Sequence, residues 1–130
     1  SLCRIRKTPQ LLVMGDFNDT PSDRSIRMLT DSAPPKWALV NLFAAQASSG
    51  AVGSHKYQGE WSQLDQIMIS KSWKRYLKAG SPQTYSAPFL LTEDKSKRGL
   101  RPKRSYHGFK YEGGFSDHLP VTADFLLPVR

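Results

Sequence analysis

The sequence predicts one domain of mixed α/β class, and three apolar segments carry that prediction. Residues 11–15, 64–70 and 119–127 have the length and apolar content of β-strands, and stretches with helical spacing lie between them. The chain has 130 residues, 38% hydrophobic and 23% charged, which is the composition of an ordinary globular domain. No apolar run approaches the ~20 residues that a transmembrane helix needs, so no transmembrane segment is expected.

The first strand and helix are expected near the start of the chain. Residues 11–15 are apolar on both faces, which is typical of a central strand covered on both sides. Pro21 and Ser22 then favour a helix over about 22–30, with Ser22 as its N-cap. The buried stripe of this helix is expected to contain Ile26, Leu29 and, as a third candidate, Met28.

The next part of the sequence is less regular. Residues 31–36 contain two prolines and predict a loop, and residues 48–54 predict a flexible link. The segment 37–45 is short and apolar, so helix and strand are hard to separate there, and we favour a short helix. Residues 54–58 are a strand candidate.

The second half holds the clearest strand. In 64–70, LDQIMIS, Asp65 shares a face with Ile67 and Ile69, while Leu64, Gln66 and Met68 share the other. Residues 71–78 suggest a short amphipathic helix.

Beyond this point the pattern weakens. Residues 81–114 contain several prolines and glycines and are expected to be irregular, with a short helix around 88–94. The last strand, 119–127, alternates apolar and other residues, and Pro120 near its start indicates an edge or entry position.

Basic residues dominate the charge. The formal net charge is +8, from 19 Lys and Arg against 11 Asp and Glu, and the basic residues gather in 4–7, 71–78 and 95–104. Such an excess favours anionic partners, but it is also typical of a solvated surface. Charge therefore biases the interpretation towards phosphates without assigning a function. Cys3 is the only cysteine, which excludes an internal disulfide and argues against a cysteine-based metal site.

Polar residues accompany all three predicted strands. Asp16 and Asn18 follow the first strand, Asp65 lies on the second, and Asp117 and His118 directly precede the third. If these strands are neighbours in one sheet, the polar groups converge at one rim. Carboxylates, an imidazole and a carboxamide there suit a hard divalent cation and a phosphate.

Each of these pieces also has a plainer explanation. The string Asp-Phe-Asn-Asp at 16–19 is ordinary turn chemistry, and Ser-Asp-His at 116–118 is equally a capped bend with a structural histidine. Asp65 alone is equally explained by pairing with a lysine. The three in this order are much less easily explained by chance.

These residues carry a resemblance to a known family. GDFND (15–19), LDQIMIS (64–70) and GGFSDHLPV (113–121) resemble successive late motifs of the endonuclease/exonuclease/phosphatase family, and KYQGEWSQLDQI (56–67) is similar to a stretch in bacterial members. The resemblance runs from about residue 11 to 127. It implies a four-layered α/β sandwich, two packed β-sheets with helices outside. Residues 1–130 would form its C-terminal half, one mainly antiparallel or mixed sheet with flanking helices, with the N-terminal half absent.

The resemblance also implies a role for each motif residue. Asp16 matches the aspartate that handles the water nucleophile, and Asn18 matches the asparagine that positions this water and the phosphate. Asp65 matches the carboxylate that holds the catalytic histidine, and His118 matches that histidine, which binds and polarises the scissile phosphate. Asp117 matches an acidic residue of the site or a ligand of a second metal. The implied cofactor is Mg²⁺ or Mn²⁺.

One part of the family pattern has no match in the chain. The earlier motifs include an asparagine and a metal-anchoring glutamate, and Glu60, Glu93 and Glu112 occur in other contexts. The chain alone is therefore expected to bind Mg²⁺ weakly and to show little or no hydrolysis. Its sheet is expected to expose an apolar face through which the chain associates with itself.

Two classes of function follow. The first is a metal-dependent phosphoesterase, a hydrolase acting as phosphodiesterase, nuclease or phosphatase on nucleic acid, inositol phosphate or a phospholipid head group. The alternative is a non-catalytic domain that binds nucleic acid or another polyanion on the same fold. Substrate contacts are expected from the loop 94–112, including Arg104, and from Tyr57, Trp61 and His55, which would otherwise belong to the core.

Overall fold

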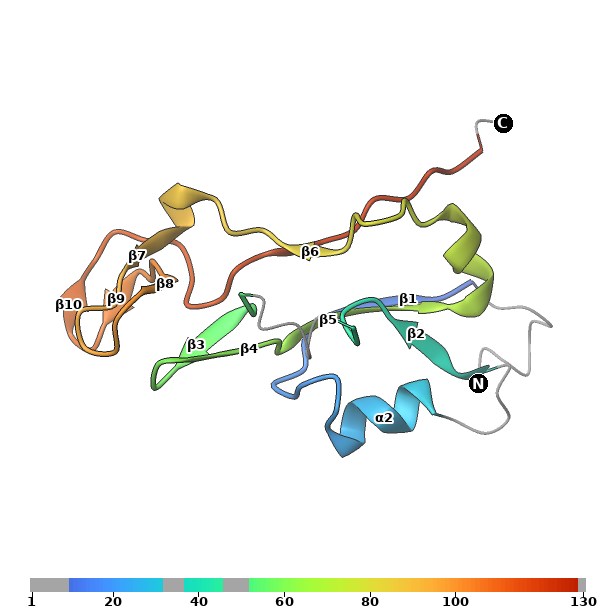
Figure 1. Ribbon diagram of the computed structural model, residues 1–130, viewed down its shortest axis with the longest axis horizontal. Helices are drawn as coiled ribbons and strands as arrows, with labels where there is room; N and C mark the ends of the chain where they lie inside the picture. Colours follow the sequence, from blue (N-terminus) through green and yellow to red (C-terminus); the bar gives the residue numbers. More distant parts are fainter. Residues whose placement is uncertain (1–9, 32–36, 46–51, 129–130) are drawn as a thin grey trace.

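The computed structural model describes residues 10–31, 37–45 and 52–128, and its architecture is mixed α/β with small antiparallel sheets. A three-stranded sheet lies at the centre, in the order β1 (Leu12–Asp16), β5 (Asp65–Ser70), β2 (Leu39–Asn41) (Figure 1). Both pairings are antiparallel. The central position of β5 in this sheet explains why four of its six residues are buried.

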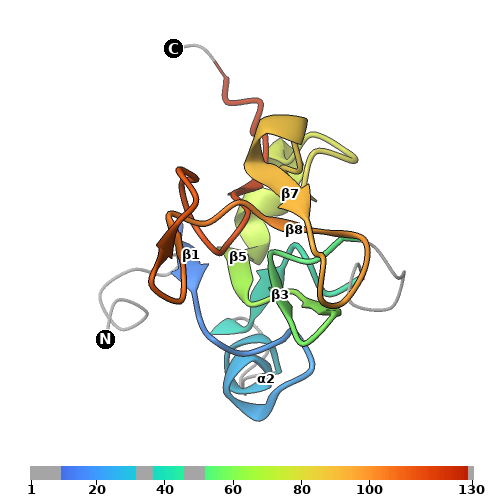
Figure 2. The same ribbon diagram turned by 90° about the vertical axis from the view of Figure 1, so that its left-hand side faces the viewer.

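Each face of β5 packs against a different layer. Helix α2 (Arg24–Thr30) lies on one side of the sheet, and the ribbon formed by β6 (Gln83–Thr84) and β11 (Val121–Thr122) lies on the other (Figures 1 and 2). The alternation along β5 produces this division because successive side chains point to opposite faces. One core cluster contains Ile26, Leu39 and Met68; the other contains Phe43, Ile67 and Ile69, with Trp73, Val121 and Phe125 against it.

Strand β1 is at the edge of the sheet. The prediction of a strand is confirmed, but the prediction that both its faces are covered is wrong, because all five residues are exposed. Met14, for example, is 60% exposed. Apolar side chains on both faces are thus compatible with an edge position as well as a central one.

The helix α2 begins two residues later than predicted. Asp23, not Ser22, is the N-cap residue, and its side chain makes no cap hydrogen bond. Instead, the Asp23 carboxylate accepts hydrogen bonds from the backbone and hydroxyl of Thr20, which lower the pKa of Asp23 below its usual value. Ile26 is buried as predicted, whereas Met28 and Leu29 are exposed, so the predicted stripe was too wide.

The segment 37–45 forms β2 followed by a turn, so the predicted helix is wrong. The side chain of Asn41 stabilises this conformation from within the core. Its amide donates to Gln66 Oε1 at 3.1 Å, and its Oδ1 accepts from the backbone N–H of Phe43 at 2.9 Å. Pairing with β5 therefore decided a conformation that the short apolar run left open.

The strand predicted at 54–58 is confirmed as β3 (His55–Tyr57), which pairs with β4 (Glu60–Ser62). Gln58 and Gly59 connect them with φ of 50° and 97°, as the two central positions of a tight hairpin turn require. The predicted helix at 71–78 is the 3₁₀ helix η3 (Lys71–Tyr76).

The region predicted to be irregular contains two hairpins. β7 (Leu91–Glu93) pairs with β8 (Leu100–Pro102), and β9 (Tyr106–His107) pairs with β10 (Lys110–Tyr111). The helix expected at 88–94 is limited to the 3₁₀ turn η4 (Pro88–Leu90). These hairpins form one end of the molecule (Figure 1).

The last predicted strand is mostly absent. Only Val121–Thr122 is a strand, with isolated bridges between Leu77 and Phe125 and between His55 and His118. The loop at 31–36, the link at 48–54, the basic group at 4–7 and Cys3 lie wholly or largely outside the described residues. Within the described residues, no helix has the length and apolarity needed to cross a membrane.

Candidate active site

Strand pairing brings the polar residues of three segments to one rim. The antiparallel register of β1 and β5 places Asp16 opposite Asp65. The bridge between His55 and His118 then joins the start of β3 to the segment that precedes β11. Residues about fifty positions apart in sequence thereby share one site.

The closest contact in this site joins His118 and Asp65. The Nδ1 atom of His118 lies 2.7 Å from Oδ2 of Asp65, and the two side chains are 22% and 15% exposed. An ionised carboxylate only accepts hydrogen bonds, so Nδ1 carries the proton and donates it. This fixes the orientation of the ring and leaves Nε2 for another partner.

Asp16 lies beside this pair and is exposed. One potential ligand atom each from Asp16, Asp65 and His118 lie within 4.8 Å of one another. The Oδ1 atom of Asp16 also accepts a hydrogen bond of 2.8 Å from the backbone N–H of Asn18. Asn18 has a φ of 53°, a left-handed conformation that Asn tolerates better than most residues. The tight turn after β1 therefore orients the Asp16 carboxylate.

A second group of ligand atoms shares His118 with the first. Asp117, His118 and His55 also place one ligand atom each within 4.8 Å of the others. The rings of His55 and His118 lie 4.6 Å apart at their centroids and are tilted by 35°. Burial lowers the pKa of His55, electrostatic interactions with His118 and Arg104 lower it further, and Asp117 and Asp16 oppose this effect. His55 was expected as a substrate contact or as a core residue, and its ring contact with His118 was not predicted.

Ser54 is a residue that sequence reasoning missed. It is fully buried, and its hydroxyl oxygen accepts hydrogen bonds from the backbone N–H groups of Leu64 at 3.1 Å and Asp65 at 3.0 Å. Its carbonyl accepts from the N–H of Leu119 at 2.7 Å. Ser54 thus ties the backbone at Asp65 to the backbone next to His118. A lone serine in a Gly-rich stretch carries no signal of this role.

The donor atoms fit a hard divalent cation. Mg²⁺ and Mn²⁺ prefer carboxylate oxygens and retain several waters. Asp65 is occupied by His118, whereas the exposed carboxylates of Asp16 and Asp117 form no ion pair with any described residue. The carboxylates of Asp16 and Asp117 belong to two groups of ligand atoms that share His118, so each offers one ligand to such an ion.

The three predicted substrate-binding residues lie in different places. The charge of Arg104 contributes to lowering the pKa of His55, and its buried Nε atom has no hydrogen-bond partner among the described residues. Tyr57 is 67% exposed at the end of the β3–β4 hairpin. Trp61 lines a separate apolar cavity of about 600 Å³, together with Val52, Ser86, Pro88, Leu91 and Leu100. Only Arg104 is thereby associated with the Asp65–His118 rim.

Comparison with known proteins gives one match. The model of the Endonuclease/Exonuclease/phosphatase family matches residues 1–126 of the 130-residue chain. No curated protein and no solved structure matches the chain. The family match covers all three segments that meet at the rim.

Proposed function

The chain belongs to the endonuclease/exonuclease/phosphatase family, and from that premise we propose that it contributes the hydrolytic centre of a metal-dependent phosphoesterase. The observation that carries this proposal is the 2.7 Å contact between His118 Nδ1 and Asp65 Oδ2 next to the exposed carboxylate of Asp16. A surface that binds polyanions requires basic side chains. Two carboxylates around an imidazole would not contribute to such binding.

The proposed reaction assigns one task to each residue. Asp16 accepts a proton from a water molecule, which attacks phosphorus as the bond to the leaving oxygen breaks. Asn18 follows Asp16 on the same turn and positions the water and the phosphate. His118, held in position by Asp65, donates from Nε2 to a phosphate oxygen when it is charged and stabilises the developing negative charge. The leaving oxygen takes a proton from solvent.

Asp117 would hold a divalent cation, Mg²⁺ or Mn²⁺, while Asp16, which belongs to the other group of ligand atoms, acts on the water. Such an ion would polarise the phosphoryl group and lower the pKa of a bound water. Because Asp117 is the one exposed carboxylate of its ligand group among the described residues, a further acidic residue is needed for tight binding. We therefore propose that the chain by itself binds the ion weakly and hydrolyses esters slowly.

The proposed architecture follows the same reasoning. The central sheet is proposed to be one of two sheets in a four-layered sandwich, with the exposed residues of β1 as part of the surface that the rest of the sandwich covers. Self-association through this surface stays a prediction. Light scattering of the purified chain at increasing concentration checks it, and a monomer throughout would argue against it.

The function is tested on the natural protein that contains these residues. With Mg²⁺ present, a panel of phosphodiesters and monoesters is expected to reveal hydrolysis, and His118→Ala and Asp16→Asn are each expected to lower kcat by about 10² to 10⁴. Asp124→Asn is the control, because Asp124 is an exposed aspartate whose carboxylate only pairs with Lys78.

The same variants separate the enzyme from the non-catalytic alternative. Loss of turnover with substrate binding retained favours the enzyme. Binding of nucleic acid without hydrolysis of any ester in the panel would instead favour the polyanion-binding domain and overturn the proposal.

A further inference from the structure

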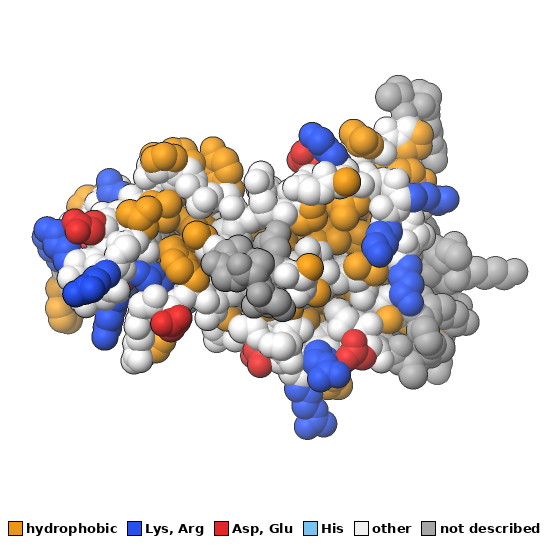
Figure 3. Space-filling view, viewed as in Figure 1, with side chains coloured by type: hydrophobic (Ala, Val, Ile, Leu, Met, Phe, Trp, Pro, Cys, Tyr) orange, Lys and Arg blue, Asp and Glu red, His pale blue; other side chains and the backbone are white. Residues whose placement is uncertain are grey.

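A charged cavity lies between the two hairpins, apart from the Asp65–His118 rim. It has a volume of about 540 Å³, within the range of small-molecule sites. Residues of β7, β8, β9, β10 and their connections line it: Thr92, Glu93, Asp94, Lys95, Ser96, Arg101, Lys103, His107, Lys110, Tyr111 and Glu112. Lys and Arg side chains gather at this end of the molecule (Figure 3).

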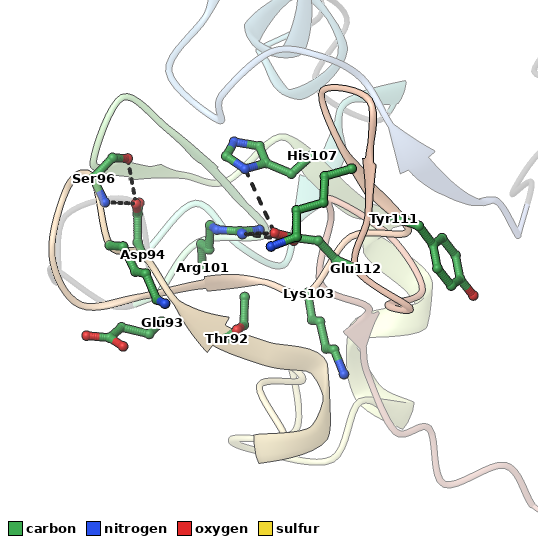
Figure 4. Close-up of a pocket in the computed structure, with 11 residues that line it drawn as sticks. Thr92, Glu93, Asp94, Ser96, Arg101, Lys103, His107, Tyr111 and Glu112 are labelled. Atoms are coloured by element: carbon green, nitrogen blue, oxygen red, sulfur yellow. Dashed lines mark hydrogen bonds and ion pairs between the residues drawn. The ribbon is translucent and has the colours of Figure 1, made fainter.

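Two of the three acidic residues of the cavity, Glu112 and Asp94, are already paired. Both carboxylate oxygens of Glu112 accept hydrogen bonds from Arg101 Nη2, at 2.7 and 2.8 Å. Hydrogen bonding to Arg101 lowers the pKa of Glu112, and the charges of Arg101, His107 and Lys110 add to the effect. Figure 4 shows Arg101 and His107 both directed at this one carboxylate. Three basic groups thus surround a single negative charge.

The charge of Asp94 is neutralised by Lys56, which does not line the cavity. Its Oδ2 atom lies 3.2 Å from Nζ of Lys56, which is 4% exposed, and its Oδ1 atom accepts hydrogen bonds from Ser96 and Lys97. Glu93 is exposed, and in Figure 4 it points away from the Arg101–Glu112 pair.

Three lysines of the cavity form no direct ion pair among the described residues, although the charge of Lys110 also acts on Glu112. These lysines are Lys95, Lys103 and Lys110. Lysines at a concave surface attract an anion with several charges and acceptor oxygens, and the hydroxyl of Thr92 adds a donor.

We propose that this cavity binds a phosphate-bearing anion that is not itself hydrolysed. Lys103 and Lys110 are the residues expected to contact it. The cavity is linked to the catalytic rim through the backbone, since the carbonyl of Lys103 accepts a hydrogen bond of 2.9 Å from the N–H of Phe115, on the segment that leads to His118. Two sources share this chemistry: a second phosphate of the substrate, or a free polyphosphate. Anion binding itself does not depend on hydrolysis, and only the first source rests on the proposed function.

The first arm of the test measures binding alone. Pyrophosphate and inorganic phosphate are titrated into the full chain in the presence of EDTA, so that no metal carries the anion to the rim. Pyrophosphate is expected to bind more tightly than phosphate, and Lys103→Gln and Lys110→Gln are each expected to weaken it about tenfold. Lys74→Gln is the matched control, because Lys74 is exposed on η3 and does not line the cavity.

Equal weakening by all three variants, or none by any, would overturn the proposed site and indicate nonspecific attraction.

The second arm uses the natural protein and compares a dinucleotide diester with and without a terminal phosphate. If Lys110→Gln raises KM only for the phosphorylated dinucleotide, the bound anion belongs to the substrate. If pyrophosphate binding responds to the variants but neither KM does, the site takes a free polyphosphate. Intact pyrophosphate binding without any hydrolysis would count against the proposed function alone.

Discussion

The central sheet and the hairpin region, residues 91–112, are stabilised by different means. In the sheet, apolar side chains of β5 are buried on both faces, and Met68 and Ile69 are fully inaccessible. In the hairpin region, most large apolar residues are exposed: Leu100, Tyr106, Phe109 and Tyr111 are all more than half accessible. Apart from Pro102, the buried residue of this region is Asp94, which pairs with the buried Lys56. The sheet therefore depends on hydrophobic burial, and the hairpins depend on specific charged contacts.

This difference has a consequence for stability. The stabilisation from hydrophobic burial does not depend on pH, whereas the stabilisation from an ion pair is lost when its carboxylate is protonated. A change in the sheet should affect the whole fold. A change in the buried ion pair should first release the hairpins, which carry the basic cavity, and leave β5 in place.

The largest effect is expected from removing a core side chain of the sheet. Met68→Ala should lower the free energy of unfolding by about 2–5 kcal/mol, because Met68 is completely buried between β5 and α2. Met14→Ala on the exposed edge strand should cost less than about 0.5 kcal/mol. Urea denaturation of both variants measures the difference. Equal losses would show that the edge strand is covered in the folded protein.

The next effect is expected in the hairpins. Asp94→Ala removes the acceptor for Lys56, Ser96 and Lys97, so amide protection in 91–102 should fall while β5 keeps its protection. Asp124→Ala is the matched control, since its ion pair with Lys78 is more than half exposed on both sides. Hydrogen exchange with residue resolution tests this. Uniform loss of protection over the chain would contradict independent stabilisation of the two regions.

The smallest effect is a dependence on acid pH. Burial alone would raise the pKa of Asp94, but hydrogen bonds from Ser96 and Lys56 outweigh it and lower the pKa to about 2. A lowered pKa means that the folded state binds the proton less readily than the unfolded state. The contribution of the Asp94 contacts to folding stability is therefore complete above about pH 4 and is lost as the pH falls towards 2.

Hydrogen exchange in 91–102 should thus accelerate between pH 4 and 2, after correction for the intrinsic rate, before β5 opens. In Asp94→Ala this added acceleration should be absent. If β5 and the hairpins open together in wild type, the contrast between the regions is wrong.

Several features were predictable because they depend on local pattern. The period of two in 64–70 indicated β5 and correctly divided Ile67 and Ile69 from Met68. The motif residues Asp65 and His118 were expected together, and the structure places them 2.7 Å apart. Their catalytic role stays a proposal. The apolar run at 11–15 located β1, although it did not reveal that the strand lies at an edge.

Other features depend on partners distant in sequence. The segment at 39–41 is a strand because it pairs with β5, and the side chain of Asn41 donates a hydrogen bond to Gln66 within the core. The hairpins escaped prediction because their strands are two or three residues long, too short to show a period. The pairing of Lys56 with Asp94 joins residues that nothing in their local context relates.

The amino-acid sequence by itself determined where the main strands run and which polar residues lie at their ends, because side-chain alternation and turn chemistry are properties of neighbouring residues. Only the tertiary structure decided which strand is buried, which carboxylates are paired, and which lysines remain available in the cavity. Burial and charge pairing are set by whatever segment of the chain comes to lie opposite, and that is not a local property.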